Sequence, residues 1–215
     1  MEVVAGIILS IFSLLFFVFI TRAVLAKQTM LIDESVSNYI YSLRTPLLTK
    51  VMFFFSLLGE QIVIAGSVLV VIFLTRRHHR KETFIFPLLL TMGLIVTSLL
   101  KILFKVPRPT IDPLLTLNSY SFPSGHSLNA FLFYATIAYF VYHFTKRKLT
   151  TIFVSVSSLI IILMVGISRI YLGVHHPSDV LAGYDVGFSL FVTTIVVDKT
   201  IDYFRFIREN TIIEA

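Results

Sequence analysis

The stretch from Thr150 to Ile170, TTIFVSVSSLIIILMVGISRI, decides the fold, because its only charged residue is Arg169, next to its far end. A helix needs roughly 20 consecutive apolar residues to cross about 30 Å of hydrocarbon. The chain contains further runs of this kind, namely Val3 to Phe19, Val51 to Leu74, Thr83 to Phe104, Leu128 to Phe144 and Val180 to Val197. The sequence therefore predicts an all-α, polytopic membrane protein with six transmembrane helices.

Charged residues are scarce throughout the chain. They make up 14% of its 215 residues, while 56% are hydrophobic. Soluble proteins average about 25% charged residues, so the composition excludes a disordered chain, a nucleic-acid-binding fold and an ordinary cytosolic enzyme. Because six spans leave only short connections, we expect a single transmembrane domain over residues 1–215 without a water-soluble core. Any function must then be built from helix ends and short loops.

The first apolar run is expected to be a retained membrane anchor. It follows Met1 and Glu2 without a basic segment, and it is longer than the roughly 7 to 15 apolar residues of a cleaved signal peptide. The chain has no cysteine, which excludes disulfides, thiolate zinc sites and thiol nucleophiles.

The basic residues divide between the two ends of such a bundle. Ten of the eighteen follow the second, fourth and sixth runs: Arg76, Arg77, Arg80, Lys81, Lys146, Arg147, Lys148, Lys199, Arg205 and Arg208. By the positive-inside rule this end is cytoplasmic, and both termini lie there. The other eight belong to the opposite end: Arg22, Lys27, Arg44, Lys50, Lys101, Lys105, Arg108 and Arg169. Cations retained on the disfavoured side of a membrane invite a functional explanation.

The connection after the third run carries several of these cations. Pro107 and Pro109 cannot continue the helix, which should end near Lys105 and leave Arg108 in an extended segment. Lys101 then lies about one helical turn inside the membrane boundary. For Lys105 we favour snorkelling of the side chain from the helix end.

The fourth run is preceded by Pro123-Ser124-Gly125-His126. Ser124 is a suitable N-cap residue. The free backbone N–H groups that open a helix also form a ready site for an anion. A plain helix cap is the alternative interpretation, but it gives no reason for His126 at this position.

The connection before the sixth run brings together Arg169, His175 and Asp179. Pro177 suits the first position of a helix, so Asp179 falls in the first turn and can reach back four residues to His175. That contact leaves the other ring nitrogen of His175 free as a nucleophile or base. An Asp in a first turn can also be an ordinary cap, but capping does not explain the neighbouring Arg169 and His175.

These groups suit the chemistry of a phosphate. Lys101, Arg108 and Arg169 match what a tetrahedral phosphate dianion requires, since arginine offers bidentate contacts and lysine a point charge. His126 and His175 supply a nucleophile and an acid. The set favours phosphoryl transfer.

The same residues resemble the motifs of the type-2 phosphatidic acid phosphatase superfamily, which read Lys-x6-Arg-Pro, Pro-Ser-Gly-His and Ser-Arg-x5-His-x3-Asp. Here they are Lys101 with Arg108-Pro109, Pro123 to His126, and Ser168-Arg169 with His175 and Asp179. The motifs are complete and in order over residues 101–179. The length and layout are most similar to bacterial phosphatidylglycerophosphate or undecaprenyl-diphosphate phosphatases.

The resemblance implies an integral membrane enzyme that hydrolyses a lipid phosphate or diphosphate at the outer membrane–water interface. Phosphatidylglycerophosphate, undecaprenyl diphosphate and phosphatidic acid are all candidate substrates. The substrate would come from the bilayer, and nucleic acid is not a partner. No metal or other cofactor is implied, and the outer loops lack the acidic cluster that magnesium would need.

The resemblance also implies a role for each motif residue. His175 would attack phosphorus to give a phosphohistidine, Asp179 would orient it, and His126 would protonate the leaving oxygen and then activate water. The phosphate oxygens would be held by Lys101, Arg108, Arg169 and the backbone amides of Ser124 and Gly125. His176 neighbours His175, and only the motif spacing makes His175 the nucleophile.

Three further features stand apart from the motifs. Glu60 and Asp185 interrupt apolar runs, and we expect structural hydrogen bonds for both, with catalysis the less favoured alternative. The segment Ile32 to Leu43 is expected to lie along the outer interface, where it could act as a partial lid.

Other functions are compatible with parts of the pattern. A phosphotransferase could use the same phosphohistidine to load an acceptor other than water. A non-catalytic lipid transporter would not need intact His126, His175 and Asp179. An intramembrane serine hydrolase using Ser124 is disfavoured, because the chain has no Gly-x-Ser-x-Gly element and the three cations would have no role.

Overall fold

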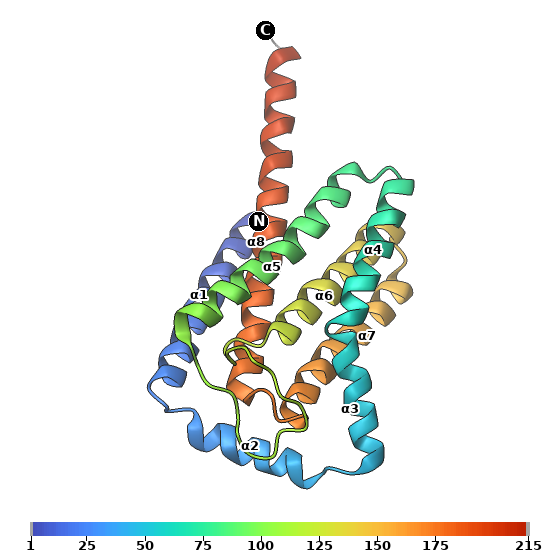
Figure 1. Cartoon of the computed structure of the whole chain (residues 1–215). Coiled ribbons are helices and arrows are strands. Elements are labelled where there is room, and N and C mark those ends of the chain that lie inside the picture. The colour runs from blue at the N-terminus through green and yellow to red at the C-terminus, as the bar shows by residue number, and fades with distance from the viewer. Residues whose placement is uncertain (1, 214–215) are drawn as a thin grey trace.

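The computed structural model describes residues 2–213, and these residues form eight α-helices and no strand, which confirms the all-α prediction. The helices are α1 (Glu2–Leu25), α2 (Met30–Ser42), α3 (Pro46–Leu58), α4 (Gln61–Arg76), α5 (Arg80–Phe104), α6 (Gly125–Thr145), α7 (Lys148–Tyr171) and α8 (Pro177–Ile213). Figure 1 shows the long helices side by side in one bundle, with α2 lying across one end.

Five stretches of the described chain are long and apolar enough to cross a membrane: Val3–Leu25, Pro46–Arg76, Arg80–Phe104, Lys148–Tyr171 and Pro177–Phe204. They contain five of the six predicted runs. The other run, Leu128 to Phe144, lies in α6, which is less apolar because it includes Asn129, His143 and three tyrosines. On the outer helices large apolar side chains face outward, and Phe12, Leu103 and Phe153 are 69%, 70% and 73% exposed. This surface is suited to lipid, and the protein is a multi-pass membrane protein.

The helix α6 forms the centre of the bundle, in contact with α4, α5, α7 and α8. Leu128, Ala130 and Leu132 on this helix are completely buried. Gly183 and Gly187 of α8 allow the backbone of α8 to approach α6 closely, since a Cβ atom at Gly183 would lie 2.5 Å from the carbonyl oxygen of Ser124. The start of α6 and the start of α8 are therefore held against each other.

The second predicted run is not one continuous helix, and the prediction was wrong in this respect. It is divided at Gly59 and Glu60 into α3 and α4. A Cβ atom at Gly59 would lie 2.6 Å from Cγ1 of Val165, so the chain approaches α7 very closely at the break. Glu60 marks this position in the sequence as an interruption of the apolar run, but the pattern on both sides does not predict that the helix ends there.

The two ends of the bundle differ in what they contain. The described ends of the chain lie at the same end as the α4–α5 and α6–α7 connections. The opposite end holds α2, the long connection between α5 and α6, and the α7–α8 connection (Figure 1). The helix α2 contains most of the segment predicted to lie along this end of the bundle, and its Asp33 accepts hydrogen bonds from the amide and hydroxyl of Ser178, at 2.9 and 2.7 Å.

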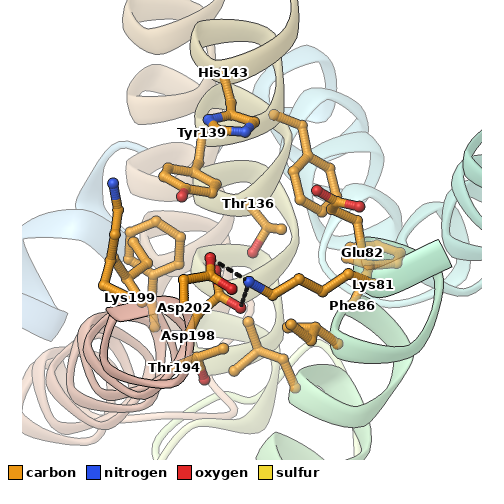
Figure 2. Close-up of a pocket in the computed structure, with 15 residues that line it drawn as sticks. Lys81, Glu82, Phe86, Thr136, Tyr139, His143, Thr194, Asp198, Lys199 and Asp202 are labelled. Carbon is orange, nitrogen blue, oxygen red and sulfur yellow. Dashed lines mark hydrogen bonds and ion pairs between the residues drawn. The ribbon is translucent and has the colours of Figure 1, made fainter. Parts of the chain in front are cut away.

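Ion pairs and hydrogen bonds tie α8 to its neighbours. Figure 2 shows Lys81 of α5 reaching Asp198 and Asp202 of α8, at 2.7 and 2.6 Å, in a pocket of about 260 Å³ near the end that holds the termini. Nearer the middle of the bundle the Ser13 hydroxyl donates to the Asp185 carboxylate at 2.7 Å. This contact between α1 and α8 is the structural hydrogen bond expected for Asp185.

Candidate active site

The side chain of Arg108 joins the α5–α6 connection to the α7–α8 connection. The helix α5 ends at Phe104, and Lys105 takes a left-handed conformation (φ 51°) that turns the chain away from the helix. The Arg108 guanidinium then donates to the carbonyl oxygens of Ser119 and Val174, at 2.6 and 2.7 Å. Its Nη1 atom also lies 3.3 Å from Nε2 of His175. Burial lowers the pKa of Arg108, but an arginine stays charged at neutral pH.

His175 and Asp179 form the pair that their spacing predicts. Nδ1 of His175 lies 3.4 Å from Oδ2 of Asp179, and the two side chains are only 2% and 1% exposed. The same carboxylate oxygen accepts a hydrogen bond from the Ser121 hydroxyl and one from the His176 amide, at 2.8 Å for the amide. The Ser121 hydroxyl also lies 3.2 Å from Nδ1 of His175. The ring of His175 is therefore held through Nδ1, and its Nε2 atom faces Arg108.

Burial also sets the protonation state of His175. It holds the pKa of this imidazole well below its ordinary value, while the Asp179 carboxylate opposes only part of the effect. The neutral imidazole that carries its proton on Nδ1 donates to Asp179 and leaves Nε2 unprotonated, with its lone pair toward Nη1 of Arg108. An unprotonated nitrogen on a fixed ring can act as a nucleophile once a phosphate takes over the contact with Arg108.

Arg169 and Lys101 form a group of cations together with Arg108, and both have N–H groups that bond no described residue. Arg169 is 2% exposed; its Nη1 atom donates to the Ser56 hydroxyl, and its Nε atom has no partner among the described residues. The Lys101 ammonium lies close enough to interact electrostatically with Arg108, Arg169 and Asp179. In the region that the structure describes, no hydrogen bond or ion pair engages that ammonium. The three predicted cations therefore converge on one place, where their positive charge favours an anion.

The turn that opens α6 differs in one detail from the prediction. Ser124 is the N-cap, as expected, and its hydroxyl accepts from the Ser127 hydroxyl at 2.9 Å. The Ser124 amide, however, donates to the carbonyl oxygen of Asp179 at 2.9 Å, so this amide is already engaged. The amides of Gly125 and His126 donate to no described residue. The free N–H groups at this helix start are therefore those of Gly125 and His126, and the Ser124 backbone instead fixes α6 to α8.

His126 makes a contact that the motif spacing does not indicate. Its Nε2 atom lies 2.9 Å from Oε2 of Glu60, the residue at the break between α3 and α4. The sequence places an unexplained carboxylate at Glu60 but gives no partner for it. A structural hydrogen bond was expected there, and the partner is the histidine proposed as the acid.

Two residues at the site were missed by sequence reasoning: Ser121, which bonds Asp179, and Ser56, which bonds Arg169. His176, whose role the sequence left open, donates its amide N–H to Asp179. The ring of His176 takes no part in these contacts, and its buried Nδ1 atom has no partner among the described residues. The geometry around Asp179 thus distinguishes His175 from His176, as the motif spacing does.

Comparison with known proteins identifies the family of the chain. Residues 82–202 match the PAP2 superfamily. The chain is 34% identical over 194 residues to phosphatidylglycerophosphatase B of Bacillus subtilis (strain 168), covering 89% of this chain and 95% of that protein.

Two crystal structures have a similar fold. One is the first transmembrane PAP2 type phosphatidylglycerolphosphate phosphatase from Bacillus subtilis, with a TM-score of 0.84 and 31% identity over 89% of this chain and 96% of that chain. The other is Aquifex aeolicus LpxE, with a TM-score of 0.62 and 28% identity over 76% of this chain and 94% of that chain. The chain therefore belongs to the PAP2 superfamily and is a membrane lipid phosphatase.

Proposed function

We propose that this phosphatase releases phosphate from a lipid phosphate of the bilayer through a covalent phosphohistidine at His175. The observation that carries the proposal is the fixed, buried ring of His175, with Nδ1 at Asp179 and Nε2 at Arg108. Arg108, Arg169 and Lys101 supply the positive charge that a phosphate dianion needs at that nitrogen.

In the first step, Nε2 of His175 attacks phosphorus and the bond from phosphorus to the lipid oxygen breaks. The protonated form of His126 gives its proton to that leaving oxygen. Negative charge on the equatorial oxygens is met by the cations and by the amides of Gly125 and His126, which donate to no described residue. The lipid leaves as an alcohol.

In the second step, His126 accepts a proton from a water molecule, and the oxygen of this water attacks the phosphorus. The bond from phosphorus to Nε2 of His175 breaks, and inorganic phosphate is released. His175 returns to its neutral form and His126 to its protonated form. General acid–base catalysis of this kind contributes roughly 10²- to 10⁴-fold to a rate.

Phosphatidylglycerophosphate is the proposed substrate, on the support of the Bacillus subtilis relative, which is named a phosphatidylglycerophosphatase. A panel of phosphatidylglycerophosphate, phosphatidic acid and undecaprenyl diphosphate tests this with the purified enzyme. The highest kcat/KM is expected for phosphatidylglycerophosphate. Release of no phosphate from any of the three would overturn the proposal, and a phosphorylated product after addition of an alcohol would identify a phosphotransferase.

The proposed topology has six spans, with α3 and α4 as one span and α6 as the least apolar. The termini would be cytoplasmic, supported by the basic residues of the α4–α5 and α6–α7 connections. The site would face the opposite side of the membrane.

Because the chain has no cysteine, Asp112→Cys and Lys146→Cys can be labelled singly on intact cells with a membrane-impermeant maleimide. We expect label at position 112 only, and label at position 146 alone would reverse the orientation.

A further inference from the structure

A crevice of about 430 Å³ adjoins the candidate active site beneath α2. Arg108, His176 and Asp179 form its inner wall, and α2 forms the facing wall. It is also lined by apolar residues of α1 and α5, including Leu25, which is 52% exposed, and Phe104. Its volume falls within the roughly 300–1,000 Å³ of typical ligand pockets, and it leads from lipid-facing residues to the phosphate-binding cations.

The crevice contains buried polar atoms without partners. Ser37 is 4% exposed, yet its hydroxyl makes no hydrogen bond to a described residue, and the same holds for the hydroxyl of Tyr41 one turn later. These two hydroxyls lie next to each other, and each can partner the other. Nδ1 of His176 is a third such atom. Buried polar groups are nearly always satisfied in native proteins. Nδ1 of His176, and the hydroxyls of Ser37 and Tyr41 where they do not bond each other, can therefore bond a ligand in this crevice.

The walls of the crevice are fixed in place. The carboxylate of Asp33 holds α2 to α8 through both hydrogen bonds from Ser178. The Arg44 guanidinium lies 4.1 Å from the centre of the Tyr41 ring and donates to the Tyr171 carbonyl oxygen, so the ring is held from one side. Burial raises the pKa of Tyr41, and its phenol therefore keeps a proton to donate. The polar groups are positioned before a ligand arrives.

Ser37, Tyr41 and His176 together offer donors and acceptors without a net charge, which suits the hydroxyl groups of a polyol. Lys27 and Lys105 also line the crevice, and each suits a second anion. We propose that this crevice is a headgroup subsite, which selects lipid phosphates that carry a free hydroxyl between the reactive phosphate and a second phosphate ester. The proposal rests on the proposed function, because it assumes that the reactive phosphate binds at Arg108 and His175.

The substrates differ in whether they can use such a subsite. Phosphatidylglycerophosphate carries a free hydroxyl on the glycerol between its two phosphates. Phosphatidic acid with the same acyl chains and a polyprenyl diphosphate both lack it. Loss of the subsite should therefore affect phosphatidylglycerophosphate alone.

The test uses the full-length protein in detergent micelles with Ser37→Ala and Tyr41→Phe. The same helix provides matched controls, Ser35→Ala and Tyr39→Phe, because the Ser35 hydroxyl bonds the Leu31 carbonyl oxygen and Tyr39 is 68% exposed. We expect each test variant to raise KM for phosphatidylglycerophosphate about five- to tenfold, as for the loss of one hydrogen bond, and to leave kcat unchanged. Hydrolysis of phosphatidic acid should be unchanged in all four variants.

A second measurement separates the headgroup from the lipid chains. Free glycerol 3-phosphate should inhibit phosphatidic acid hydrolysis less in the test variants than in the wild type, while inhibition by inorganic phosphate stays the same. Equal losses on both lipids, or unchanged inhibition by glycerol 3-phosphate, would overturn the subsite. Absence of phosphate release from every lipid in the wild type would instead overturn the proposed function.

Discussion

The carboxylate of Glu60 lies 2.9 Å from Nε2 of His126, across the break that separates α3 from α4. The candidate site therefore contains two histidine–carboxylate pairs, one at His175 and Asp179 and one at His126 and Glu60. The first pair is almost fully buried, while in the second pair His126 is 19% and Glu60 51% exposed. Two such different surroundings suit a neutral nucleophile at His175 and a group that exchanges protons with water at His126.

Replacing Glu60 with Gln should slow turnover without preventing it. The amide keeps a hydrogen bond but removes the negative charge that favours the protonated form of His126. We expect kcat to fall about tenfold, less than the full 10²- to 10⁴-fold of a general acid. The alkaline limb of the pH–rate profile should move to lower pH, because His126 loses its proton more readily.

The control for this variant is Glu82→Gln, a change of the same kind near the opposite end of the bundle, which should leave the pH–rate profile in place. A merely structural role for Glu60 would lower the amount of active enzyme without moving the profile. An unshifted profile in Glu60→Gln would therefore show that its charge does not act on His126.

Replacing His175 with Ala should abolish phosphate release. The mutant lacks the nitrogen that forms the covalent bond, and we expect a loss of at least about 10³-fold. With radiolabelled substrate, a brief quench in alkaline detergent should trap label on the wild-type protein that is stable to alkali and is lost on later acid treatment, as a phosphohistidine is. Label that survives acid would indicate a serine or threonine ester, and turnover by the mutant would exclude His175 as the nucleophile. His143→Ala, at the other end of α6, serves as the control.

The sequence alone predicts the helical elements well where the cause is local. The run from Thr150 to Ile170 becomes α7 (Lys148–Tyr171), because apolar composition over that length determines a membrane helix. The contact of His175 with Asp179 follows from helical spacing and is also present. The break at Gly59 is different. Glu60 marks an interruption of the apolar run, but no local pattern records that α7 approaches here, where a Cβ atom at Gly59 would lie 2.6 Å from Cγ1 of Val165.

The same distinction between local patterns and contacts of distant residues explains which residues of the candidate site were predicted. The cations and histidines are recognisable because their spacing is fixed by helix ends. Ser121 and Ser56 are not, because their partners Asp179 and Arg169 lie 58 and 113 residues away along the chain. The Ser124 amide was assigned to phosphate on the rule for helix starts, and the close approach of α8 to α6 diverts it to the Asp179 carbonyl oxygen.

Ser121 provides a test of how Asp179 holds the nucleophile. Its hydroxyl donates to the Asp179 carboxylate and lies 3.2 Å from Nδ1 of His175. In Ser121→Ala the carboxylate keeps only part of its hydrogen bonding, so the ring of His175 should be less well oriented. We expect kcat to fall about tenfold while KM stays unchanged, which corresponds to roughly 1.4 kcal/mol lost only in the transition state. A rise in KM with unchanged kcat would place Ser121 in phosphate binding instead.

The buried imidazole of His175 should make the folded protein sensitive to acid. Burial lowers its pKa from 6.5 to about 3, and the Asp179 carboxylate opposes only part of this effect. As pH falls below about 6.5, the unfolded chain takes up a proton at this position while the folded chain does not. The contribution of neutral His175 to the free energy of unfolding is thus complete above about pH 6.5. As the pH falls below this value, the free energy of unfolding decreases by up to about 1.4 kcal/mol per pH unit. Thermal unfolding in detergent between about pH 7.5 and about pH 5 should therefore show a steeper loss of apparent Tm for the wild type than for His175→Gln, in which the side chain at position 175 does not titrate. Parallel curves for the two proteins would mean that His175 binds its proton equally well in the folded and unfolded states.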